Sequence, residues 1–97
     1  MPGYIGLLKY TQQGLDDVKN GPERIKQSKA LAEKMGIRPI GTWVTMGPYD
    51  MVIIGEAPDD QTVAAFSLAL AKAGNVTTMT MRAFSEEEFA EVAARLP

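Results

Sequence analysis

The apolar residues of this 97-residue chain form two kinds of run, which differ in spacing. Short runs that are continuous or alternate with polar residues predict β-strands, and they occupy residues 4–10, 37–46, 49–57 and 75–84. Longer runs with apolar residues three or four positions apart predict amphipathic helices, and they occupy residues 21–36, 59–74 and 85–97. The polar segment 11–20 is predicted as a connection with room for one helical turn around Leu15 and Val18.

Residues at the ends of the helical runs support these boundaries. Pro22 suits the first turn of a helix, where its missing N–H is not needed, and Gly36 suits a helix end. Asp59 or Asp60 can cap the second long helix. Ser85 followed three positions later by Glu88 predicts a capping box at the start of the last helix.

The order of elements is β-α-β-β-α-β followed by a C-terminal helix. This order predicts one α+β domain over residues 1–97 with a ferredoxin-like, four-stranded antiparallel sheet in strand order 4-1-3-2 and two helices on one face. The first and third strands contain the apolar runs "YIGLL" and "MVII", which fits central positions. Pro39 lacks a backbone donor, so the second strand is expected at an edge.

Two helices cover only one face of such a sheet. The other face, about 350 Å² in plane, would then expose apolar side chains of the central strands, which monomers seldom leave wet over such an area. We therefore expect a homodimer in which sheet faces pack together, with higher assembly left open. The alternative is that the C-terminal helix folds across the open face of its own sheet.

Composition excludes several kinds of chemistry. The chain has no cysteine and no histidine, so disulfides, thiolate nucleophiles and the commonest metal ligands are absent, and we expect no metal and no cofactor. The net charge is −2 and the basic residues are dispersed, which argues against nucleic-acid binding. No apolar run is long enough to span a membrane, so the sequence predicts a cytoplasmic protein without a membrane association.

The tetrapeptide Gly47-Pro48-Tyr49-Asp50 lies between two predicted strands. Gly47 and Pro48 have the properties of a tight turn, and Asp50 can accept hydrogen bonds from turn amides. A binding site for a small ligand near this turn would use an aromatic pair and a carboxylate, drawn from Trp43, Thr45, Tyr49 and Asp50. The alternative is that Trp43 packs in the subunit contact while the other residues only form the turn.

A second candidate site lies at the start of the first long helix. Lys19 and Arg24 are two cations near a helix N-terminus, which attracts anions. The alternative is ordinary surface charge, with Arg24 pairing with Asp16 or Asp17. A further cation, Arg82, is expected to meet an acid such as Glu56 across the dimer.

Several segments together make the chain similar to the GYD-domain proteins: Gly47-Pro48-Tyr49-Asp50, "TQQGLDDVKNGPER", "EAPDD", "LALAKAGNVTT" and "RAFSEEEF". One departure is Gly21, where similar proteins have a serine before the proline. The resemblance implies a ferredoxin-like fold of the dimeric α+β barrel type, and it supplies no catalytic residues. A more distant likeness to effector-binding domains of leucine-responsive regulators implies metabolite binding between subunits.

Two functions remain open from the sequence. The first is a small homodimeric domain that binds or senses a small metabolite or mediates protein association. The second is a cofactor-independent enzyme of the dimeric α+β barrel type, monooxygenase- or isomerase-like. Fold alone does not decide between them.

Overall fold

The structure, a computed structural model, describes all residues 1–97. Its four strands are β1 (Gly3–Tyr10), β2 (Arg38–Val44), β3 (Met51–Glu56) and β4 (Val76–Ala83). Its helices are α1 (Gln12–Asp16), the 3-10 turn η1 (Val18–Asn20), α2 (Gly21–Lys34), α3 (Asp60–Lys72) and α4 (Glu86–Ala94). The four predicted strands and three predicted helices are confirmed, with ends that differ by up to about three residues.

The strands form one antiparallel sheet in the order β2-β3-β1-β4, which read from the β4 edge is 4-1-3-2. β1 and β3 are central, and Ile5 pairs with Ile54 between them. β2 lies at an edge, as its proline predicts, and its register is interrupted between Pro39 and Gly41. A proline is tolerated there because an edge strand leaves one side of its backbone unpaired.

The capping predictions are confirmed at two helices. The Asp59 carboxylate accepts a hydrogen bond from the Thr62 amide at 2.8 Å and begins α3. Ser85 and Glu88 form the predicted capping box at the start of α4. Both caps satisfy amides that the first turn of a helix leaves without partners.

The segment 11–20 is more ordered than a connection with one turn. It contains both α1 and η1, because Thr11 caps α1 by accepting a hydrogen bond from the Gly14 amide at 3.2 Å. The helix has only five residues and few apolar ones, so the sequence shows no helical periodicity of apolar residues there. Its stability depends on contacts with the rest of the chain, since isolated helices this short are marginal.

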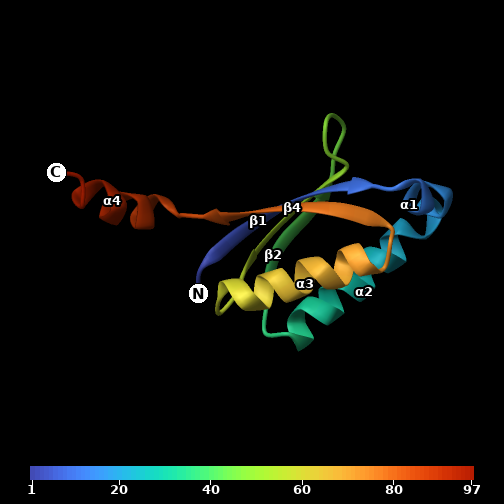
Figure 1. Cartoon of the computed structure of the whole chain (residues 1–97), viewed down its shortest axis with the longest axis horizontal. Helices are drawn as coiled ribbons and strands as arrows, with labels where there is room; N and C mark the ends of the chain where they lie inside the picture. Colours follow the sequence, from blue (N-terminus) through green and yellow to red (C-terminus); the bar gives the residue numbers. More distant parts are fainter.

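Helices α2 and α3 lie side by side over one face of the sheet (Figure 1). The strand residues that face them are the buried ones, including Tyr4, Leu8 and Met51. From the helices and the loop before α3, Ala32, Val63 and Ala57 complete this layer. Only 8 of the 97 residues are buried, so the core is thin for a chain of this length.

The opposite side of the sheet, which we call the open face, has no helix over it (Figure 1). Strand alternation places on it the residues that lie between the buried ones in β1 and β3 and their neighbours in β2 and β4. Its apolar members are Ile5, Leu7, Trp43, Val52, Ile54, Met79 and Met81.

Helix α4 does not cover the open face. It follows β4 after only Phe84 and Ser85, and it extends away from the sheet as an arm at the end of the molecule (Figure 1). The alternative in which the C-terminal helix folds back over its own sheet is therefore wrong. The connection is short, and Ser85 within it is fixed as the N-cap of α4 in an extended backbone conformation.

Candidate functional site

Asp50 directly precedes β3 and connects the start of this strand to the end of β1 through hydrogen bonds. Its carboxylate Oδ2 accepts a hydrogen bond from the Tyr10 amide at 2.8 Å, and its own amide donates to the Leu8 carbonyl at 2.8 Å. The residue pattern predicts turn amides as the donors to Asp50, and that prediction is wrong. Asp50 instead continues the pairing of the central strands beyond their last regular residue pair.

The turn itself has the geometry that its residues predict. Gly47 has a φ of +123°, in a region that L side chains rarely adopt. The Thr45 hydroxyl donates to the Tyr49 carbonyl at 2.7 Å and closes the loop on both sides of Pro48. The structure therefore brings Thr45 and Tyr49 into direct contact.

The two aromatic side chains of the predicted ligand site belong to the open face. Trp43 is 53% exposed, and its ring folds back over Gly41, where an added Cβ would lie 2.3 Å from the ring. The Tyr49 hydroxyl donates a weak hydrogen bond to Met79 Sδ at 3.5 Å. Neither aromatic residue lines the cavities on the helix-facing side of the sheet, so a ligand site at this turn stays a prediction.

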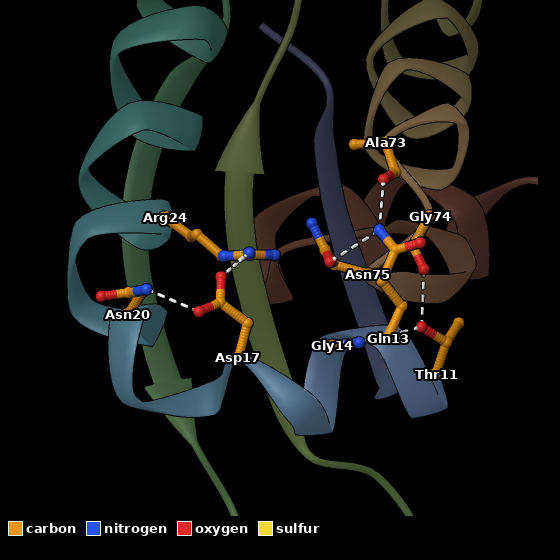
Figure 2. A network of polar contacts seen from close by, with 9 residues as sticks. All are labelled: Thr11, Gln13, Gly14, Asp17, Asn20, Arg24, Ala73, Gly74 and Asn75. Atoms are coloured by element: carbon orange, nitrogen blue, oxygen red, sulfur yellow. Dashed lines mark hydrogen bonds and ion pairs between the residues drawn. The ribbon is translucent and has the colours of Figure 1, made fainter.

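Arg24 forms the ion pair that is the alternative to anion binding at the start of α2. One guanidinium nitrogen, Nη2, pairs with Asp17 Oδ2, and Asn20 donates to the other oxygen of Asp17 at 2.5 Å (Figure 2). Lys19 lies in η1 and forms no ion pair. No contact brings Lys19 and Arg24, the two residues predicted to bind an anion, together. The other nitrogen of Arg24, Nη1, is buried without a hydrogen-bond partner.

A hydrogen-bonded network around α1 was not predicted from the residue pattern. The Thr11 hydroxyl donates to the Gly74 carbonyl at 2.6 Å, and the Thr11 amide donates to the Asn75 carbonyl at 3.0 Å (Figure 2). Gly14 is buried against that same carbonyl. The only signal in the sequence was the Thr-x-x-Gly segment that the chain shares with similar proteins.

This network lies at one end of a cavity that is partly open to solvent. The cavity has a volume of about 270 Å³ and lies between α2, α3 and the helix-facing side of the sheet. Its apolar lining includes Leu8, Ile25, Leu31, Ile53, Phe66 and Leu70. Arg24, Asp17 and Asn75 supply polar groups at its α1 end.

The start of the C-terminal arm has its own polar cluster. Arg82 pairs with Glu88 at 3.3 Å, and its guanidinium lies 4.5 Å from the centre of the Phe84 ring. The hydrogen bond from the Ser85 amide, together with Arg82, lowers the pKa of Glu88 below its ordinary value of 4.5. Glu56 pairs with Arg38 at 3.1 Å, so both charges expected to meet across a dimer have partners within the chain.

One tyrosine on the helix-facing side has a perturbed pKa. The Tyr4 hydroxyl donates to Asp60, and this hydrogen bond is the main reason that the pKa of Tyr4 rises above its ordinary value of 10.0. No three acidic residues gather in a way that could hold a metal ion. None of the helices is both long and apolar enough to cross a bilayer.

The fold and these contacts define a class of small α+β proteins whose sheet has one face covered by helices and one face uncovered. A Gly-x-Tyr-Asp turn joins the strands β2 and β3 of this sheet. The chain belongs to the GYD domain family, whose model matches residues 4–93. It is also 39% identical over 97 residues to a protein of Thermus thermophilus, covering 99% of each chain. That relative is named glutamine synthetase and cystathionine beta-lyase binding protein.

Proposed function

We propose that this protein is a homodimeric binding protein that associates with metabolic enzymes. The observation that carries the proposal is that the chain exposes more surface than a compact monomer of its size. Its accessible surface is 6737 Å², whereas the scaling for compact monomers gives about 5,400 Å² for 10.5 kDa. The excess, about 1,300 Å², exceeds the roughly 800 Å² that each partner buries in a standard interface.

The dimensions of the chain support the same conclusion. Its radius of gyration is 14.6 Å, compared with about 12.5 Å expected for a compact domain of 97 residues. The extra length comes from the arm, which extends beyond the sheet (Figure 1). A chain that folded as a monomer would gain apolar burial by folding the arm back, and this one does not.

A second copy of the chain is the occupant we assign to the open face. The face is apolar across its central strands and carries Trp43 and Met79, both more than half exposed. Aromatic residues and methionine are enriched in the centres of protein interfaces. Two such faces packed together would bury these residues as the two sheets of a sandwich do.

The arm takes part in the same contact in this proposal. α4 has nine residues, so it is about 14 Å long, and its large exposed apolar residues are Phe89 and Val92. Their spacing of three places them on one side of the helix, and exposed Leu96 follows shortly after the helix ends. We assign this side to the second copy, where the arm would pack beside the paired sheets.

The partners are proposed from the relative. Because the relative is named for binding glutamine synthetase and cystathionine beta-lyase, we propose enzymes of these two classes as partners of this chain. The protein would then act in the cytoplasm beside those enzymes. Metabolite binding at Trp43, Thr45, Tyr49 and Asp50 would in this proposal occur at the edge of the dimer contact.

The dimer is tested with a charge on the open face. Met79→Glu would place a carboxylate in the sheet contact, and Ala65→Glu, on the exposed side of α3, is the matched control. Multi-angle light scattering at micromolar concentration should give a dimer for the natural chain and the control, and a monomer for Met79→Glu. A compact, monodisperse monomer for the natural chain would contradict the proposal.

The enzyme partners require a separate measurement. The immobilised chain is titrated with purified glutamine synthetase and, separately, cystathionine beta-lyase from the organism that encodes it. Saturable binding of at least one enzyme is expected. If neither binds while light scattering gives a dimer, the partner assignment is wrong and the dimer remains.

A further inference from the structure

A cavity of about 270 Å³, partly open to solvent, lies between α2, α3 and the helix-facing side of the sheet. That volume is near the lower limit of small-molecule pockets, about 300 Å³. Because exposed residues such as Gln27 and Lys29 belong to its lining, the cavity communicates with the surface between the helices.

The orientation of the Asn75 amide at the α1 end follows from its hydrogen bonds. The Ala73 carbonyl can only accept, so the group of Gln13 that contacts it at 3.0 Å is the amide nitrogen Nε2. The same nitrogen donates to Asn75 Oδ1 at 3.1 Å. Asn75 therefore presents its nitrogen, which donates no hydrogen bond within the chain, on the other side. Figure 2 shows this group pointing toward Arg24.

Arg24 contributes a second donor without an acceptor. Its Nη2 pairs with Asp17, but its Nη1 is buried and has no partner. Donor groups from α2 and from the turn before β4 thus lie at the same end of the cavity, and of the two only Arg24 Nη1 is a buried donor without a partner (Figure 2). A buried donor without an acceptor is unfavourable, so this end is complementary to an acceptor that the chain itself does not supply.

The charges around the cavity determine which acceptor fits. The ionised side chains in the lining are Asp17, Arg24 and Lys29; Arg24 pairs with Asp17, and Lys29 is an exposed cation that forms no ion pair. The lining is therefore positive overall, and a carboxylate could accept from the free donors of Arg24 and Asn75. A cationic ligand would meet no free carboxylate, since Asp17 already accepts from Arg24 and Asn20.

We propose that this cavity binds a small monocarboxylate with an alkyl or aromatic body. The carboxylate lies between Arg24 and Asn75, and the apolar body lies between α2, α3 and the sheet. Arg24 is thereby an anion-binding residue through its free nitrogen, while Lys19, which does not line the cavity, has no part. The site is on the helix-facing side of the sheet, so it does not depend on the homodimer or on the enzyme partners.

The test uses hexanoate, octanoate and phenylacetate as probes, with hexanamide and octanamide as uncharged counterparts of the first two. Isothermal titration calorimetry and thermal unfolding are measured on the full chain. At least one carboxylate should bind saturably and raise Tm, and the corresponding amide should bind at least tenfold more weakly. A ligand that binds only the folded state stabilises it by RT ln(1 + [L]/Kd), so Tm rises with ligand concentration.

Two variants separate this site from binding elsewhere. Ala69→Leu places a larger side chain in the cavity without touching its polar end, and Ala71→Leu, on the exposed side of the same helix, is the control. We expect Ala69→Leu to abolish binding while remaining folded, and Ala71→Leu to bind normally. Arg24→Gln should bind the carboxylates at least tenfold more weakly.

Three results would overturn the proposal. The first is the absence of carboxylate binding up to millimolar concentration by the folded natural chain. The second is undiminished affinity in both Ala69→Leu and Arg24→Gln, which would place the ligand elsewhere. The third is equal affinity for the carboxylates and their amides, which would refute the role of charge at Arg24.

Discussion

Replacement of Gly14 by alanine is the sharpest test of how α1 is held. An ideal Cβ at Gly14 would lie 2.1 Å from the Asn75 carbonyl oxygen, 3.0 Å from its carbon and 3.2 Å from the Tyr10 ring. Two of these atoms are backbone, so they cannot move aside as a flexible side chain would. The same carbonyl accepts the Thr11 amide hydrogen bond at 3.0 Å, and a shift of more than about 1 Å would break it.

The magnitude results from two opposed effects. Alanine favours the helix over glycine by about 1 kcal/mol. Overpacking costs about 1–3 kcal/mol, and loss of the hydrogen bond to Thr11 costs a further 0.5–1.5 kcal/mol or so. The net destabilisation is therefore about 0.5–3.5 kcal/mol, which lowers Tm by roughly 2–28 °C in a domain of this size.

Gly21→Ala is the matched control, because Gly21 is also buried and begins a helix. Its φ is −52°, and the nearest atom to an added Cβ is the Tyr10 hydroxyl oxygen at 3.9 Å. Alanine there should leave Tm unchanged or raise it slightly. Thermal unfolding followed by circular dichroism is compared at one fixed protein concentration, because an oligomer's Tm depends on concentration. A Gly14→Ala variant as stable as the natural chain would refute the reasoning.

Two further predictions concern Asp50 and Glu88. Asp50→Ala leaves the Tyr10 amide without an acceptor and should lower stability by about 1–2 kcal/mol, whereas Asp50→Asn keeps an acceptor and should lose less; chemical denaturation distinguishes the two. The pKa of Glu88 is lowered in the folded arm, so its contribution to capping α4 is present above pH 4.5 and is lost as pH falls through the folded-state pKa. As pH falls through this pKa, hydrogen exchange at the Ser85 amide should accelerate relative to neighbouring amides, both in the natural chain and in the control Glu87→Gln. In Glu88→Gln the exchange should be fast at all pH values. A pH response in Glu88→Gln equal to that of the natural chain would contradict this prediction.

The fold could be predicted where local chemistry and the apolar pattern agree. The runs "YIGLL" and "MVII" indicated central strands, Pro39 indicated an edge, and Ser85 with Glu88 indicated the start of the last helix. These signals are local: each depends on a residue's own backbone preference or on a neighbour three or four positions away. The sequence left open whether the third helical run, residues 85–97, covers the second face of the sheet, and in the structure it does not.

The candidate site could be predicted less well because its contacts join distant segments. Asp50 meets Tyr10 across 40 positions, and Gln13 meets Asn75 across 62. No periodicity or spacing encodes such pairs, so the helical turn around Leu15 was predicted without its contacts, and the wrong amides were predicted as donors to Asp50. Arg24 shows the intermediate case: its pairing with Asp17 was an available alternative, but the burial of its unpaired nitrogen depends on the tertiary structure.

Side-chain packing is incomplete on both faces of the sheet. On the helix-facing side, small residues at Gly6 and Gly55 of the central strands and at Ala69 and Ala73 of α3 leave space that the surrounding side chains do not fill. On the open face, β-branched and aliphatic residues of the same strands have nothing packed on them. A chain of this size has little stability to spare when both layers are incomplete. Binding to the folded state stabilises it by mass action, so a second copy on one face and a ligand in the other layer would each favour the same folded chain. The strands β1 and β3 present alternate residues to the two layers, so each occupant would stabilise the folded chain from its own side of the sheet.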